Sequence, residues 1–167
     1  LFNQVQELLG DGFAGVILTG PPGTSKSHYA ALIATRLAEF DPARVRFIQF
    51  HPSYQYEDFV EGFVPTEDGR FRLTDKHLLD MCKAAEDHPG KLCVLVIDEI
   101  SRSEPARVFG EALTYVEMSK RGQIFRRAAN TVGQPRAHTW TAKPYGPRVH
   151  EAFRRRVIKI ICANSRD

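Results

Sequence analysis

The stretch GPPGTSKS, from Gly20 to Ser27, is one residue away from the phosphate-binding pattern G-x-x-x-x-G-K-[ST]. The difference is Ser25, which stands where the pattern has its last glycine. In such a loop the glycines let backbone N–H groups converge on anionic oxygens at a helix N-terminus. Lys26 supplies a cation for the β- and γ-phosphates, and Ser27 supplies a hydroxyl for Mg²⁺. The predicted nucleotide-binding residues are Gly20, Pro21, Pro22, Gly23, Thr24, Ser25, Lys26 and Ser27.

The segments on either side of this loop support the interpretation. GVILTG, residues 15–20, is a short apolar run with β-branched residues and predicts a buried parallel strand. KSHYAALIATRLAEF, residues 26–40, predicts a helix that ends before Asp41-Pro42 and packs its apolar residues inward. These apolar residues are Tyr29, Leu32, Ile33, Leu37 and Phe40. An ordinary turn before a helix is the alternative, but a strand–loop–helix context is what the motif requires.

A second element, about 70 residues further on, has the complementary chemistry. LCVLVIDEI, residues 92–100, predicts a central strand that ends in Asp98 and Glu99. Parallel α/β sheets bind ligands at the carboxyl ends of their strands. Asp98 would hold Mg²⁺, mostly through water, and Glu99 would orient or deprotonate the attacking water. Acidic residues at a strand end also cap helices, so this pair is informative only together with the loop.

The remaining segments continue the alternation of strands and helices. We expect a strand at 45–50, a helix at 56–63, a turn at Asp68-Gly69 between short strands, a helix capped by Thr74, and a helix capped by Ser103 with Leu113 packed inward. This alternation predicts a three-layer α/β domain with a mainly parallel sheet. Phe59 and Phe63 are expected in the core, and His51 is expected to be a hydrogen-bonded loop residue.

Composition sets broader limits. The 167 residues suit one domain, and the chain has no apolar run long enough for a membrane span or pattern typical of a signal peptide. The three scattered cysteines indicate structural thiols and a cytoplasmic protein. Charge is uneven: residues 1–120 carry 12 Lys/Arg and 18 Asp/Glu, whereas residues 121–167 carry 11 and 2. The basic stretch could meet phosphates of a nucleic acid or simply be solvated.

Three segments together resemble the AAA+ ATPases, and most closely the McrB-like group near the MoxR and dynein-related branches. LTGPPGTSKS is similar to the Walker A motif, and FIQFHPSYQYEDFVEGFVP, residues 47–65, resembles a more specific signature of that group. VLVIDEISRSEPARVFGEAL is similar to the Walker B region, with Ser101 in place of the usual Asn. The resemblance covers residues 1–125, whereas residues 126–167 follow the pattern less well.

This resemblance implies a three-layer P-loop NTPase core over residues 1–167, without the family's helical lid, so the domain alone is expected to be incomplete as an enzyme. It implies ATP or GTP with Mg²⁺ as ligands and nucleotide-driven assembly of copies into a ring, usually a hexamer. Arg102 would face the adjacent subunit. A restriction nuclease is the expected kind of partner, with DNA contacted through that partner or through the basic stretch.

Two assignments compete in the last part of the chain. VIKIICAN, residues 157–164, resembles the strand that ends in the family's polar sensor, which makes Asn164 the sensor. EAFRRR, residues 151–156, resembles the arginine-finger segment but precedes that strand, which is the wrong order. Both assignments cannot hold, and we favour Asn164.

The sequence thus predicts an NTPase in which Lys26, Glu99 and Asn164 act in catalysis and Ser27 and Asp98 hold Mg²⁺. The alternatives are a nucleotide-binding assembly module without hydrolysis and a nucleic-acid-binding protein that uses the basic stretch. Ser25 bears on the first alternative. At a positive φ, serine would cost roughly 1–2 kcal/mol relative to glycine. We expect a negative φ at Ser25, because a helix begins at the next residue.

Overall fold

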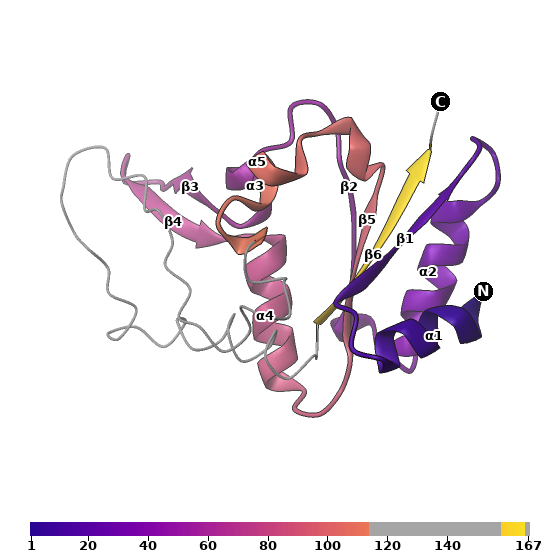
Figure 1. The fold of residues 1–167 in the computed structure, drawn as a ribbon. Helices are drawn as coiled ribbons and strands as arrows, with labels where there is room; N and C mark the ends of the chain where they lie inside the picture. Colours follow the sequence, from indigo (N-terminus) through magenta and orange to yellow (C-terminus); the bar gives the residue numbers. More distant parts are fainter. Residues whose placement is uncertain (114–157, 166–167) are drawn as a thin grey trace.

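A computed structural model describes residues 1–113 and 158–165. Four parallel strands form the main sheet: β1 (Gly15–Gly20), β2 (Val45–Gln49), β5 (Cys93–Asp98) and β6 (Ile158–Ser165). Their order across the sheet is β1-β6-β5-β2 (Figure 1). The last strand along the chain therefore lies between the strands that carry the two predicted motifs, and all four strands end at the same edge.

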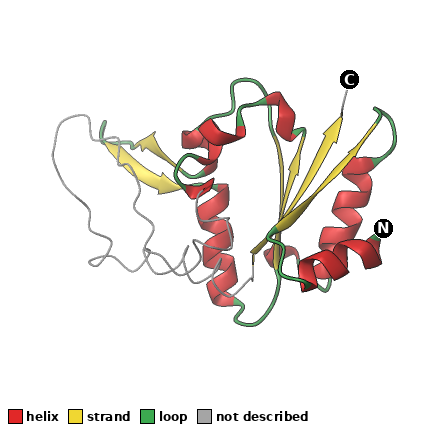
Figure 2. Ribbon diagram, in the orientation of Figure 1, coloured by secondary structure: helices red, strands yellow, loops and turns green. Residues whose placement is uncertain are grey.

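Helices cover both faces of this sheet (Figure 2). α1 (Phe2–Gly10) and α2 (Lys26–Leu37) pack on one face, where Val5, Ile33 and Val96 share a buried cluster. α3 (Tyr56–Phe59), α4 (His77–Asp87) and α5 (Pro105–Phe109) lie on the other face, whose cluster includes Phe59 and Leu95. The prediction of a three-layer α/β fold is confirmed.

β5 is a deeply buried strand, and its residues from Cys93 to Ile97 are all buried. Its continuous apolar sequence follows from burial on both faces. Cys82 and Cys93 are buried free thiols, as the scattered cysteines predicted, and burial raises the pKa of both. For Cys162, which lies in β6, the side chain is outside the described part.

An antiparallel hairpin is inserted between α3 and α4. It consists of β3 (Glu61–Pro65) and β4 (Phe71–Asp75), and the Asp68-Gly69 turn predicted between short strands is confirmed. The predicted helix over residues 56–63 is wrong beyond Phe59, and Thr74 belongs to β4 rather than capping a helix. Close approach explains the early end, because a Cβ at Gly62 would lie 2.5 Å from the carbonyl oxygen of Glu57. The helix α3 therefore ends at Phe59, and the strand β3 begins at Glu61.

Several predicted core residues prove to be exposed. Phe59 is fully buried as predicted, but Phe63 in the hairpin is exposed. In α2, Ile33 and Leu37 are buried, whereas Tyr29 and Leu32 are exposed because the apolar positions extend around more of the helix than the sheet covers. The helix ends at Leu37 rather than at residue 40, and Phe40, beyond its end, is also exposed. Leu113 is also exposed.

α5 is shorter than predicted and begins differently. Gly110 follows its last residue with a φ of 52°, and Glu104 rather than Ser103 is its N-cap residue. The Ser103 hydroxyl is buried and finds no hydrogen-bond partner in the described part of the chain, so the predicted cap is wrong.

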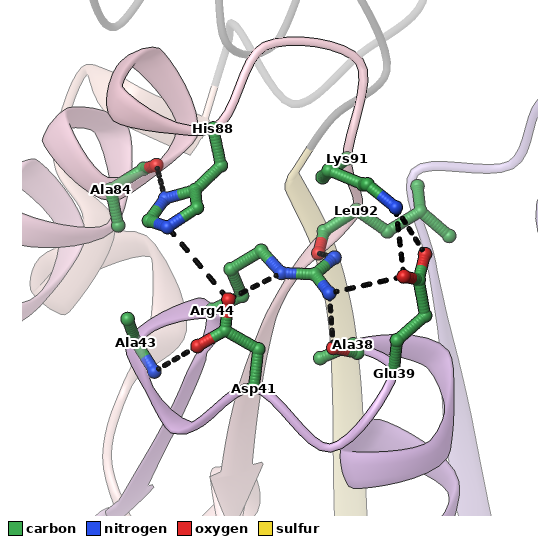
Figure 3. Close-up of polar contacts among 9 residues, drawn as sticks. All are labelled: Ala38, Glu39, Asp41, Ala43, Arg44, Ala84, His88, Lys91 and Leu92. Atoms are coloured by element: carbon green, nitrogen blue, oxygen red, sulfur yellow. Dashed lines mark hydrogen bonds and ion pairs between the residues drawn. The ribbon is translucent and has the colours of Figure 1, made fainter.

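A buried arginine joins the ends of three elements at the opposite edge of the sheet (Figure 3). Arg44, in the short 3-10 helix η1 (Pro42–Arg44), donates to the carbonyl oxygens of Ala38, just after α2, and Leu92, just before β5. Its Nε also donates to Asp41 Oδ2 at 3.0 Å. These bonds tie the end of α2 to the starts of β2 and β5.

Within residues 1–113 and 158–165, no helix combines the length and the apolar character that crossing a membrane requires. Arg154 to Arg156 and most of the basic stretch lie outside these residues.

Candidate functional site

The loop between β1 and α2 curls around the side chain of Lys26, the first residue of α2. The Lys26 Nζ donates to the carbonyl oxygens of Gly20 at 2.9 Å and Pro21 at 2.6 Å, and to Thr24 Oγ1 at 3.2 Å. The Thr24 hydroxyl in turn donates to the Pro21 oxygen at 2.8 Å. A cation therefore lies at the centre of the loop, at the N-terminal end of a helix.

Two residues of the loop have left-handed backbone. Gly23 has a φ of 76°, and a Cβ built there would meet no heavy atom within 4 Å. Ser25 has a φ of 57° and a ψ of 27°, so the expectation of a negative φ is wrong. The start of the helix does not impose helical dihedrals on the residue before it. Ser25 reverses the chain, and its carbonyl oxygen accepts the Tyr29 N–H at 3.0 Å.

The loop meets the acidic strand through one hydrogen bond. Ser27 Oγ donates to Asp98 Oδ1 at 2.8 Å across a sequence separation of 71 residues. The same carboxylate oxygen accepts the backbone N–H of Glu99 at 3.1 Å. The fold therefore brings together two predicted Mg²⁺ ligands from different elements, although β6 separates β1 from β5 in the sheet.

Glu99 stands directly after β5 in an unusual conformation. Its φ of 53° and ψ of 43° are left-handed, and the short 3-10 helix η2 (Ile100–Arg102) follows it. Its carboxylate Oε2 accepts Arg102 Nε at 3.2 Å, and its carbonyl oxygen accepts the Arg102 N–H at 2.9 Å. Its side chain is 19% exposed, whereas that of Arg102 is 60% exposed.

Asn164 lies near the end of β6. It is paired in register with Thr19 of β1, and the preceding residue, Ala163, is paired with Asp98 of β5. The backbone of Asn164 is therefore placed between the ends of the two strands that carry the motifs. The competing candidates Arg154 to Arg156 lie outside the described residues.

A small pocket of about 240 Å³ adjoins Ser27 and Asp98, and its lining also includes Phe47, Ile48 and Gln49 of β2 and Val96 of β5. Sequence reasoning did not select Phe47 or Gln49. Gln49 could have been selected because it lies at the carboxyl end of β2, where it is paired in register with Asp98 of β5. His51 is confirmed as a hydrogen-bonded loop residue, since its Nδ1 lies 2.9 Å from Ser53 Oγ.

The residues of the site fit a nucleotide with Mg²⁺. The loop combines a lysine, a left-handed glycine and the N-terminus of a 12-residue helix, which together suit a polyphosphate. Ser27 and Asp98 offer oxygen ligands, as a hard cation prefers. The described residues contain no group of three or more His, Cys, Asp or Glu side chains able to hold a metal ion. Mg²⁺ needs no such cage, because phosphates and water complete its coordination.

Comparison with known proteins agrees with this arrangement. Residues 15–157 match the family described as AAA domain (dynein-related subfamily). Over 109 residues the chain is 42% identical to the type IV methyl-directed restriction enzyme EcoKMcrB subunit of Escherichia coli K12. This match covers 65% of this chain and 24% of that protein. Over 86 residues it is 38% identical to the ATP-dependent zinc metalloprotease FtsH of Thermus thermophilus. That match covers 52% of this chain and 11% of FtsH.

The chain thus spans only about a quarter of the first relative's length and about a tenth of the second's. The family match, in contrast, extends over most of this chain and includes both the loop of Lys26 and the acidic end of β5. The chain belongs to the AAA+ ATPases, in the dynein-related subfamily of AAA domains.

Proposed function

We propose that this domain binds a nucleoside triphosphate, ATP or GTP, together with Mg²⁺ and hydrolyses it to drive a partner. The observation that carries this proposal is the 2.8 Å hydrogen bond between Ser27 and Asp98. It joins the last residue of the phosphate loop to the first acid of the strand end. An ordinary glycine turn is not expected to form a hydrogen bond with a carboxylate 71 residues away at the carboxyl edge of a parallel sheet.

Each residue then has a role that follows from its position. The backbone N–H groups of the loop and Lys26 would hold the phosphates, while Ser27 and Asp98 would hold Mg²⁺. Bound Mg²⁺ would supply neutralisation of the charge that develops on the phosphate oxygens. Glu99 would orient a water molecule and accept its proton. Asn164, whose backbone lies between the ends of β1 and β5, would act as the polar sensor.

The partner is proposed from similarity alone. The McrB relative is named as a subunit of a restriction enzyme, which favours a nuclease as the partner of this chain. We further propose that copies of the chain assemble into a ring, as the AAA family implies. DNA would be contacted through the partner or through the basic residues 121–167, which carry 11 Lys/Arg and 2 Asp/Glu.

Nucleotide binding is tested by Lys26→Ala in the full chain. A fluorescent ATP or GTP analogue is titrated with Mg²⁺, and Lys83→Ala, which removes an exposed lysine of α4, is the matched control. The proposal expects weaker binding only for Lys26→Ala, because its ammonium lies at the centre of the loop. Equal affinity in the two variants would remove the phosphate-loop assignment.

Hydrolysis is tested separately by Glu99→Gln. This change keeps the shape of the side chain but removes the base, so binding should persist while turnover falls by roughly 10²–10⁴-fold. An unchanged turnover rate would make Glu99 a structural residue of the strand end.

A second candidate function is a nucleotide-binding assembly module that does not hydrolyse. The left-handed backbone of Ser25 favours it, because a side chain in place of glycine strains the loop next to Lys26. The same experiments distinguish the two. Binding that depends on Lys26, combined with no turnover in the unmodified full chain, would select the assembly module.

A further inference from the structure

The ion pair between Glu99 and Arg102 is built into the backbone turn that follows β5. Both the main chain and the side chain of Arg102 bond to Glu99, at 2.9 Å between the backbone groups and 3.2 Å between Nε and Oε2. The spacing of three residues matches one turn of the 3-10 helix η2. The carboxylate of Glu99 is therefore directed by a residue of its own turn.

Glu99 also carries backbone strain that its surroundings must hold in place. A non-glycine residue in the left-handed region is strained and persists only where several contacts fix it. Contacts within the described turn that do so include the bonds from the Glu99 N–H to Asp98, from the Arg102 N–H to Glu99 and from Arg102 Nε to Glu99. The first of these ties Glu99 to the carboxylate oxygen that also accepts the Ser27 hydroxyl.

We propose that Arg102 is a positioning residue, which acts through the Glu99 carboxylate to hold it in the orientation needed to accept a proton from water. This inference rests on the proposed hydrolytic function and adds to it a role for Arg102 within its own chain. Removing the guanidinium would take away one of the contacts that orient the Glu99 carboxylate, while the two backbone hydrogen bonds of the turn remain. Misplacing a reacting group by about 1 Å can cost on the order of 10²-fold in rate.

The contribution of the pair to stability is expected to be small, which separates positioning from a structural role. Arg102 is 60% exposed, and exposed ion pairs contribute little to the free energy of unfolding. Arg102→Ala should therefore leave thermal unfolding nearly unchanged while lowering the rate. Arg107→Ala is the matched control, because Arg107 is an exposed arginine of the adjacent helix α5.

The experiment compares steady-state hydrolysis by the full chain, its Arg102→Ala variant and its Arg107→Ala variant. We expect Arg102→Ala to lower kcat at least about tenfold with KM unchanged within twofold. Arg107→Ala should change neither quantity. An unchanged or increased kcat in Arg102→Ala would overturn the proposal. The ion pair would then either have no effect on hydrolysis or slow it.

A double-mutant cycle decides whether Arg102 acts through Glu99. In the Glu99→Gln background, measured by single turnover with labelled nucleotide, the additional Arg102→Ala change should alter the residual rate by less than about twofold. A further drop as large as in the unmodified chain, or a rise in KM, would show that Arg102 contacts the nucleotide itself. If Glu99→Gln alone leaves the rate unchanged, Glu99 is not the base of the proposed hydrolysis. That conclusion holds independently of the result for Arg102→Ala.

Discussion

At the scale of single residues, Ser25 holds its backbone in a region that disfavours a side chain. Its φ of 57° belongs to the folded loop, so the strain lowers the stability of the fold. Ser25→Gly should relieve roughly 1–2 kcal/mol of strain, offset by about 0.4–1 kcal/mol from the greater freedom of the unfolded chain. The expected net gain is on the order of 0.5–1 kcal/mol, measured as the free energy of unfolding in urea.

Ser25→Ala is the control for this change, because alanine keeps the Cβ and removes only the hydroxyl. It should not stabilise the chain. A gain of equal size in both variants would mean that the hydroxyl, and not the backbone, is the source of strain.

The site residues illustrate what a sequence can and cannot predict at this scale. The residue types and spacing of Lys26, Ser27 and Asp98 predict one common site, and the structure does bring Ser27 and Asp98 into contact. Their roles toward phosphate and Mg²⁺ stay predictions. The sign of φ at Ser25 was predicted wrongly, because the direction of the chain there is set by how the loop closes between β1 and α2. The bond between Arg102 and Glu99 could not be foreseen, since it depends on the turn after β5.

At the scale of elements, the cluster around Arg44 joins three element ends and makes stability depend on pH. Hydrogen bonds from the Ala43 N–H and from Arg44 hold the pKa of Asp41 below its ordinary value of 3.8. A carboxyl with a lowered pKa stabilises the fold while it is ionised. Its contribution is complete above about pH 4 and is lost as the pH falls through the lower pKa of the folded state.

Asp41→Asn should therefore flatten the acid side of the stability profile. The free energy of unfolding in urea is measured between roughly pH 2 and 7. Asp87→Asn, which changes an exposed carboxylate outside this cluster, is the comparison and should keep the slope of the unmodified chain. An identical acid slope in Asp41→Asn would show that the hydrogen bonds of Asp41 do not depend on its charge.

The docking of α5 against α3 depends on Gly110. A Cβ there would lie 2.9 Å from the Tyr56 ring, and the φ of 52° disfavours any side chain. Gly110→Ala should therefore lower the free energy of unfolding by about 2–3 kcal/mol, from both strain and overpacking. Gly90→Ala is the matched control, because Gly90 has a φ of 78° but nothing within 4 Å of a built Cβ.

The difference between the two alanine variants isolates the contact with Tyr56. Equal destabilisation would mean that the Tyr56 ring moves aside at little cost. The same glycine explains why the predicted length of α5 was too great. The left-handed Gly110 ends α5 at Phe109, although residues 112–113 are helical again.

At the scale of the whole molecule, the alternation of strands and helices was enough to predict the layers but not the order of the strands. β6 lies between β1 and β5, although it comes last in the sequence. Such pairing depends on contacts between distant segments, which local patterns do not encode. The hairpin was predicted in part, because its Asp68-Gly69 turn has a local signature while the start of β3 depends on Gly62 approaching Glu57.

We propose that the loop after β1 and the acidic end of β5 form one site for a nucleotide and Mg²⁺. Calorimetric titration of ATP and GTP, with and without Mg²⁺, tests it most directly in the unmodified chain, Ser27→Ala and Asp98→Asn. We predict that Mg²⁺ tightens binding of at least one nucleotide to the unmodified chain and that both substitutions remove most of this gain. Mg²⁺-dependent tightening that persists in full in both variants would show that Ser27 and Asp98 do not hold the ion.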